Sequence, residues 1–239
     1  MIEFATIKDK NELSSLWQMT FLEDSQVIEK FFQSVFPTVV TPIIRVGGEI
    51  ASSLFLLPCK IGNYNGKCVY CAMTKYAYRG KGYMKQLLDF SYEYCKENNL
   101  DFLFLVPAEP SLFDYYAKCG FENFGTSRMF TLSENIPEEK EKIEFDYEIK
   151  FDNAVLEYWK NACVVYGGEV TDFGLIFDDE ETVIRNAKGN YNDIPEKYKK
   201  SGIKIKGNIN FGEIYTPAMI KTENEEIKNM NCYIGITLE

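Results

Sequence analysis

Histidine is absent from all 239 residues. This absence excludes a Ser-His-Asp triad and the usual histidine proton shuttle, so a general acid or base has to be Tyr, Asp, Glu, Cys, Lys, water or a chain terminus. It also argues against structural zinc. Cys68 and Cys71 have the spacing of half a zinc knuckle, but the sequence holds no second close cysteine pair. We therefore expect no metal, and the seven scattered cysteines are typical of reduced side chains in a cytosolic protein.

Long apolar runs and a surplus of positive charge are missing as well. No apolar run approaches the length that spans a bilayer, and Met1 to Phe4 lack the basic and apolar pattern of a secretory signal. The net charge of −10 argues against a nucleic-acid partner. We expect a cytoplasmic protein that binds neither membrane nor nucleic acid. The acidity is compatible with a cationic substrate such as an amine, and equally with a net charge that only keeps the protein soluble. The sequence does not give the oligomeric state, and a homo-oligomer is possible.

The sequence is organised around residues 67–98. The apolar run Val69 to Thr74 leads into a basic turn, Tyr78 to Gly82, which opens into a helical pattern with apolar residues at steps of three and four. Glycines let backbone N–H groups approach a ligand, and a helix start adds unpaired donors and a positive dipole end. This order predicts a pyrophosphate site, although a short basic turn on its own is also compatible with an ordinary surface loop.

The segment Arg79-Gly80-Lys81-Gly82-Tyr83-Met84 resembles the acyl-CoA pyrophosphate loop of the GNAT acetyltransferase superfamily. Arg79 and Gly82 match the family pattern, and Met84 departs from its small last residue. The resemblance implies acetyl-CoA as co-substrate, with its acetyl carbonyl held by main-chain N–H groups at Ala72, Met73 and Thr74. It also implies that the pyrophosphate is held by the loop residues Arg79, Gly80, Lys81, Gly82, Tyr83, Met84 and Lys85.

A second segment, Leu112 to Phe121, resembles the later motif of the superfamily, an aromatic-tyrosine pair followed by Gly-Phe. The resemblance implies that Tyr116 is the general acid beside the CoA sulfur; a packed core aromatic is the alternative. A phenol with a pKa of about 10 suits the protonation of a departing thiolate. The resemblance also implies that Val106, Pro107 and Ala108 face the pantetheine arm. Glu109 and Asp114 are candidate bases, with helix capping as the alternative reading.

Further residues resemble the bacterial branch related to the enhanced-intracellular-survival aminoglycoside acetyltransferases. These are Leu16-Trp17, Phe21 to Ser25, Leu57-Pro58 and Phe104 to Ala108. That branch has a degenerate second acetyltransferase-like domain, and its terminal carboxylate acts as the base. The resemblance thus makes Glu239 a further candidate base.

We expect an α/β (mixed α+β) protein with a GNAT-like fold. Residues 1–132 are predicted to form the acetyltransferase domain, with the order strand, two helices, three meandering strands, helix, strand, helix, strand. The acidic, proline-bearing segment 133–148 is predicted to be a linker. Residues 149–239 are predicted to form a smaller α/β domain, including a helix over 178–188 that begins at acidic residues.

The leading functional hypothesis is an acetyl-CoA-dependent N-acetyltransferase that acts on a primary amine of a small cationic acceptor. Two alternatives remain at this point. One is a non-catalytic CoA-binding module that uses the fold as an interaction surface, because a fold does not fix an activity. The other is an acyltransferase for a longer acyl chain, since no feature of the sequence sizes the acyl pocket.

Overall fold

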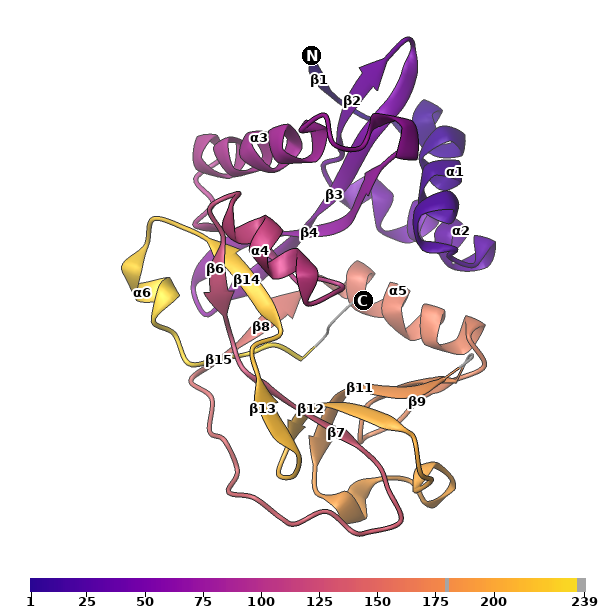
Figure 1. The fold of residues 1–239 in the computed structure, drawn as a ribbon, viewed down its shortest axis with the longest axis vertical. Coiled ribbons are helices and arrows are strands. Elements are labelled where there is room, and N and C mark those ends of the chain that lie inside the picture. The colour runs from indigo at the N-terminus through magenta and orange to yellow at the C-terminus, as the bar shows by residue number, and fades with distance from the viewer. Residues whose placement is uncertain (179–180, 236–239) are drawn as a thin grey trace.

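A computed structural model describes residues 1–178 and 181–235 (Figure 1). Two β-sheets and their helices form a mixed α/β protein, which confirms the expected fold class. In Figure 1 the first sheet lies in the upper half of the molecule and the second in the lower half, and a long helix, α5 (Asn153–Val165), runs between them.

The first sheet carries the predicted meander. Its main path runs β1 (Ile2–Phe4), β2 (Pro42–Val46), β3 (Glu49–Ile61), β4 (Tyr64–Thr74), β5 (Phe102–Leu105), β14 (Ala218–Lys221) and β6 (Glu122–Phe124). Strands β4 and β5 are parallel, and the other pairs on this path are antiparallel. At its far end β3 also pairs with β8 (Tyr147–Phe151), which pairs in turn with β15 (Cys232–Tyr233).

Helices cover both faces of this sheet. Helices α1 (Lys10–Phe21), α2 (Ser25–Ser34) and α5 share one core, centred on Trp17, Phe31 and Phe55. Helices α3 (Tyr83–Glu97) and α4 (Ser111–Ala117) share the other. The apolar stripe of α2 supplies the first core, and Asp24 begins that helix by accepting a hydrogen bond from the Gln26 amide at 2.6 Å.

The second sheet has its own core. It runs β13 (Glu213–Tyr215), β7 (Ser127–Thr131), β12 (Lys204–Ile209), β11 (Thr182–Gly189), β10 (Leu175–Asp178) and β9 (Glu169–Val170). Ile184, Ile205 and Phe211 are fully buried in it. A single turn of helix, α6 (Glu225–Lys228), follows β14.

The two sheets exchange strands across the predicted division at residue 132. Strand β7, on the N-terminal side of that division, pairs with β12 and β13 in the second sheet. Strand β14, from the C-terminal part, lies between β5 and β6 in the first sheet. The division into domains at 1–132, 133–148 and 149–239 therefore stays a prediction, because neither sheet is built only from strands on one side of residue 132.

Two local expectations are wrong. The helix predicted over 178–188 is wrong: Asp178 ends β10, and residues 182–188 belong to β11, where Ile184 and Ala187 are buried in the second sheet's core. Helix capping, the alternative reading for Glu109 and Asp114, does not occur: Pro110 is the N-cap of α4, no side chain caps the helix, and the Ser111 hydroxyl donates to Glu109 at 3.3 Å. The predicted strand 233–238 lies largely outside the described residues, as does the candidate base Glu239.

Candidate active site

The two parallel strands of the first sheet separate soon after they meet. Strand β4 pairs with β5 only from Gly66 to Cys68, opposite Phe102 to Phe104. Beyond this point β4 carries a bulge against β3, where Cys71 has a φ of 48°. Past Cys68 the two strands no longer pair, and residues at the end of β4 and after β5 line one cavity.

The glycine turn after β4 has the geometry of an anion site. Gly80 and Gly82 have φ values of 73° and 76°, in the left-handed region that favours glycine. The first helical hydrogen bond of α3 runs from the Gln86 amide to the Gly82 carbonyl at 3.1 Å. The amides of Tyr83, Met84 and Lys85 therefore have no acceptor within the helix, and they lie at its positive end.

The charged side chains of the turn each contact a neighbour. Arg79 Nε donates to the Thr74 carbonyl at 3.2 Å. Lys81 Nζ lies 5.0 Å from the centroid of the Tyr78 ring, and Lys85 Nζ lies 2.6 Å from Asp89. The turn from Arg79 to Gly82 is exposed, so these cations and the unpaired amides at the start of α3 lie close together in the chain at an accessible surface.

The larger side chains at the start of α3 face inward. Tyr83 and Met84 are half buried against the core under this helix. The size of Met84, which departs from the family pattern, is thus accommodated on the inner side of the helix.

At the end of β4 the side chains of Met73 and Thr74 make packing and hydrogen-bond contacts within the protein. Met73 is fully buried, and its carbonyl accepts a hydrogen bond from the Ser52 hydroxyl at 2.9 Å. The Thr74 hydroxyl lies 2.8 Å from the same Ser52 hydroxyl. Ala72 lines the cavity described below. Any role of these three residues toward an acetyl group would therefore be a main-chain role, as the sequence reasoning required.

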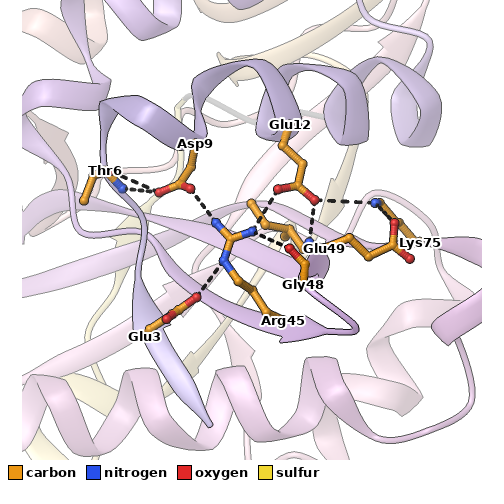
Figure 2. Close-up of polar contacts among 9 residues, drawn as sticks. Glu3, Thr6, Asp9, Glu12, Arg45, Gly48, Glu49 and Lys75 are labelled. Atoms are coloured by element: carbon orange, nitrogen blue, oxygen red, sulfur yellow. Dashed lines mark hydrogen bonds and ion pairs between the residues drawn. The ribbon is translucent and has the colours of Figure 1, made fainter.

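A network of ion pairs braces the segment that leads into the turn (Figure 2). Glu49 accepts from Tyr78 at 2.6 Å and from Lys75 at 2.7 Å. Lys75 also approaches Glu12 at 3.6 Å, and Glu12 pairs with Arg45 at 2.9 Å. Arg45 contacts Glu3 and Asp9 as well, so one guanidinium joins three carboxylates. This network, which we call the Glu49 brace, ties the turn to α1 and to the β2–β3 hairpin.

A cavity of about 620 Å³ lies at the splay of β4 and β5. Ala72, Val106, Ala108 and Tyr116 line it, whereas Pro107 is buried and is not part of the lining. Helix α4 carries Tyr116, whose ring packs against Tyr115 and Phe121 at centroid distances of 5.3 and 6.0 Å. Burial raises the pKa of Tyr116 to about 12, so the phenol keeps its proton at neutral pH.

The structure does not bring two of the predicted bases, Glu109 and Asp114, to the lining of this cavity. Glu109 and Asp114 are exposed, and neither is among the residues that line it. A carboxylate that the sequence reasoning did not single out, Glu23 in the α1–α2 loop, lines it instead. Nearby, the hydroxyls of Tyr70 on β4 and Tyr158 on α5 are hydrogen-bonded at 3.0 Å.

The C-terminal part of the chain closes the far end of the cavity. Its wall comes from α5 and from strands β10 and β11, which contribute Tyr158, Trp159, Ala162, Tyr166, Phe177, Val183 and Arg185. No pattern in the sequence indicated this wall, because it depends on how the second sheet docks against α5.

Comparison with known proteins decides the family. Residues 1–124 match the model of the family described as an acetyltransferase (GNAT) domain. The chain belongs to this acetyltransferase family. The match ends at Phe124, the last residue of β6, so the inserted strand β14 comes from outside it. No curated protein matches the chain.

Two solved structures share the GNAT fold over nearly the whole chain. One is a conserved protein of Enterococcus faecalis V583 described as a probable N-acyltransferase. It has a TM-score of 0.65 at 10% identity, over 93% of this chain and 72% of that chain. The other is a GCN5-related N-acetyltransferase from Anabaena variabilis, with a TM-score of 0.56 at 13% identity, over 94% of this chain and 73% of that chain. The likeness shows that the fold of the C-terminal part, as well as that of the N-terminal part, is shared with these two proteins.

None of the described helices is long and apolar enough to cross a membrane. No group of three or more Cys, Asp or Glu side chains suited to a metal ion occurs in 1–178 or 181–235. The absence of a metal from the reaction remains a prediction.

Proposed function

We propose that this acetyltransferase transfers the acetyl group of acetyl-CoA to a primary amine of a small acceptor, whose amine is cationic in solution. The observation that carries the proposal is the continuity of the site. Ala72 lines the cavity that holds Tyr116, and from Ala72 the chain runs through the end of β4 and the glycine turn to the unpaired amides at the start of α3. Such a path has the order of parts that acetyl-CoA requires, from diphosphate to thioester.

The diphosphate would lie on the turn after β4. The amides of residues 82–85, the dipole of α3 and the charges of Arg79, Lys81 and Lys85 all favour an anion there. The Glu49 brace would hold this turn in its binding shape before the ligand arrives.

Transfer would proceed by direct attack. The neutral amine nitrogen forms a bond to the carbonyl carbon, the carbon–sulfur bond breaks, and the proton that the attacking nitrogen then loses goes to the leaving thiolate, which gives the free thiol of coenzyme A. Main-chain N–H groups from Ala72 to Thr74 would stabilise the oxyanion, and the Tyr116 phenol would donate to the sulfur. Glu23 is the cavity-lining carboxylate near β4, and it would accept the proton that the ammonium has to lose.

The finer parts of the assignment belong to the same proposal. Proteins of the enhanced-intracellular-survival branch have a second domain after the acetyltransferase domain. The fold that this chain shares with two solved structures also continues beyond residue 124, which supports the resemblance to that branch without being specific to it. A cytoplasmic location is supported by the seven cysteines, all in the described residues and all free. A small-molecule acceptor without nucleic acid or membrane as partner, and a homo-oligomer, remain predictions from the composition.

Thiol release from acetyl-CoA tests the proposal. We expect the protein to release coenzyme A in the presence of a panel of primary amines, and Glu23→Gln to slow release more at neutral pH than at alkaline pH, where amines are already deprotonated. Glu109→Gln, at an exposed carboxylate outside the cavity, is the matched control. Absence of both thiol release and acetyl-CoA binding would refute the proposal.

A further inference from the structure

The cavity that holds Tyr116 is lined from both faces of the first sheet. Tyr116 of α4 and Leu105 of β5 belong to the core under α3 and α4. Trp17 of α1 and Tyr158 of α5 line the same cavity, but they belong to the core on the opposite face. Since β4 and β5 no longer pair beyond Cys68, the cavity connects the two faces of the sheet at this place.

The face that carries α3 is the side of the co-substrate in the proposed function. Tyr83 and Met84, at the start of α3, pack against the same core as Tyr116. A diphosphate on the amides there would bring the thioester to Tyr116 from this face, with the acetyl group toward the opening between β4 and β5. The part of the cavity on the face of α5 is then left for the molecule that attacks the acetyl group.

Aromatic side chains gather in this second part. They come from α1, β4, β10 and the C-terminal end of α5, and they are Trp17, Tyr70, Tyr158, Trp159, Tyr166 and Phe177. Their rings contact one another: the centroids of Trp17 and Tyr70 lie 5.5 Å apart, and those of Tyr166 and Phe177 lie 6.4 Å apart. The hydroxyls of Tyr70 and Tyr158 are hydrogen-bonded to each other, so these two residues offer a ligand chiefly their rings. Such a lining favours a flat apolar body.

The charged residues of the lining do not suit an acceptor with several positive charges. Each further ammonium that leaves water needs a carboxylate, and the described lining holds two, Glu23 and Glu181. Glu181 is already paired with Lys204 at 2.6 Å. The one lining guanidinium, that of Arg185, lies 5.0 Å from the centroid of the Phe177 ring and adds positive charge to this wall.

From this lining we infer that the acceptor is a primary amine carried on an aromatic body, and that it is neither polyhydroxylated nor polycationic. The aromatic body lies among the rings of α1, α5 and β10, and the amine lies beside β4, where it reaches the acetyl carbon. The inference rests on the proposed function, which supplies the transfer, and it adds the class of acceptor. It makes Phe177, from the C-terminal part of the chain, a specificity-determining residue.

A matched set of amines tests the inference on the parent protein. 3-Phenylpropylamine, propylamine and 1,3-diaminopropane share a three-carbon chain with a primary amine and differ in the group at its other end. We expect kcat/KM for 3-phenylpropylamine to exceed that for propylamine by about 10- to 100-fold, the range that burial of an aromatic side chain gives. 1,3-Diaminopropane should gain nothing over propylamine, because its second ammonium would lose its hydration among the rings.

Substitutions at the wall locate the aromatic body. Phe177 is half buried, and Phe177→Ala should reduce the preference for 3-phenylpropylamine over propylamine by about 3- to 10-fold, the worth of one ring contact. Phe177→Leu, which keeps an apolar side chain, should retain part of the loss. Val164→Ala, at an exposed position of α5 outside the cavity, is the control and should retain the whole preference.

The outcomes separate this inference from the proposed function. If acetyl-CoA binds and amines turn over, but propylamine or 1,3-diaminopropane is preferred, or Phe177→Ala leaves the preference unchanged, the inference is wrong and the proposed function stands. Preference for hexanoyl-CoA over acetyl-CoA would overturn it too, since an acyl chain would then fill the aromatic space. If no amine turns over, calorimetry of the N-acetylated amines with coenzyme A decides. Stronger binding of the phenylpropyl product, weakened in Phe177→Ala, supports the inference, and equal or absent binding overturns it.

Discussion

Replacing Tyr116 by phenylalanine removes one hydroxyl from the cavity and leaves the ring in place. The ring is packed against Tyr115 and Phe121, and the structure shows no hydrogen bond from the Tyr116 hydroxyl to another described residue. The substitution should therefore have little effect on the melting temperature. Any large effect on turnover would then come from the hydroxyl itself.

The magnitude follows from the proton affinities of the two partners. The phenol has a pKa of about 12. A thiol has a pKa of about 8.5, so full transfer of the proton to the thiolate would be uphill by roughly 5 kcal/mol at about 1.36 kcal/mol per pKa unit. Tyr116 should thus act chiefly as a hydrogen-bond donor to the sulfur. Loss of one such preorganised donor typically lowers kcat by about 10²–10³, and we expect Tyr116→Phe to show a loss in this range.

Steady-state thiol release between pH 6 and pH 10 measures this effect. Because burial raises the pKa of Tyr116, the phenol stays protonated across that range, and the ratio of parent to variant kcat should not change with pH. The KM for acetyl-CoA should change little. A kcat equal to that of the parent would refute the donor role and leave Tyr116 as a packed aromatic. A ratio that falls steeply above pH 8 would instead show that the phenol loses its proton much earlier than the structure indicates.

Three further predictions concern the frame around the site. Glu49→Gln should raise the KM for acetyl-CoA without lowering kcat, because it loosens the brace on the turn; Glu93→Gln, at an exposed ion pair on α3, should not. Hydrogen bonds from Lys75 and Tyr78 lower the pKa of Glu49. The stabilisation by Glu49 is therefore present above the ordinary carboxyl pKa and is lost as the pH falls through the lowered pKa of the folded protein. The difference in melting temperature between parent and Glu49→Gln should narrow in acid, and a constant difference would contradict this. Gly66→Ala should destabilise the protein by about 1–3 kcal/mol in urea unfolding. The added methyl group would lie 2.4 Å from the Phe102 ring, at the point where β4 pairs with β5. An unchanged unfolding midpoint would show that the ring moves aside freely. A chain ending at residue 132 lacks β14, whose Met219 and Ile220 are buried between β5 and β6, so it should not melt cooperatively; a cooperative melt would support a folding unit that ends there.

Local signals in the sequence predicted the elements that local chemistry decides. The strands on either side of Gly47 and Gly48 are the first two of the three predicted meandering strands, and both glycines adopt the positive φ that a tight turn requires. The strand, turn and helix around Arg79 are confirmed for the same reason. Strand β11 was mistaken for a helix, since its acidic start is typical of a helix N-terminus and its partner β12 lies further along the chain. Periodicity does not reveal such a long-range pairing.

The residues of the site also differ in how far local sequence predicts them. Tyr116 and the turn after β4 belong to contiguous motifs, and the structure brings them to one path. Glu23, Trp159 and Arg185 come from three segments far apart in the sequence, and they share a cavity only because β14 and α5 fix the C-terminal part against the first sheet. Their residue types alone carry no signal of that meeting.

Calorimetric titration of acetyl-CoA into the parent protein and Gly82→Ala tests the central claim, that the backbone of the turn after β4 binds the diphosphate. Gly82 has a φ of 76°, and nothing lies within 4 Å of a methyl group added there, so alanine is opposed by conformation alone. A left-handed alanine costs about 1–2 kcal/mol, which predicts affinity for acetyl-CoA about 5- to 30-fold weaker than that of the parent. Binding of acetylpantetheine, which lacks the diphosphate, should be unchanged. No heat with the parent protein, or equal affinity of parent and variant for acetyl-CoA, would contradict the account.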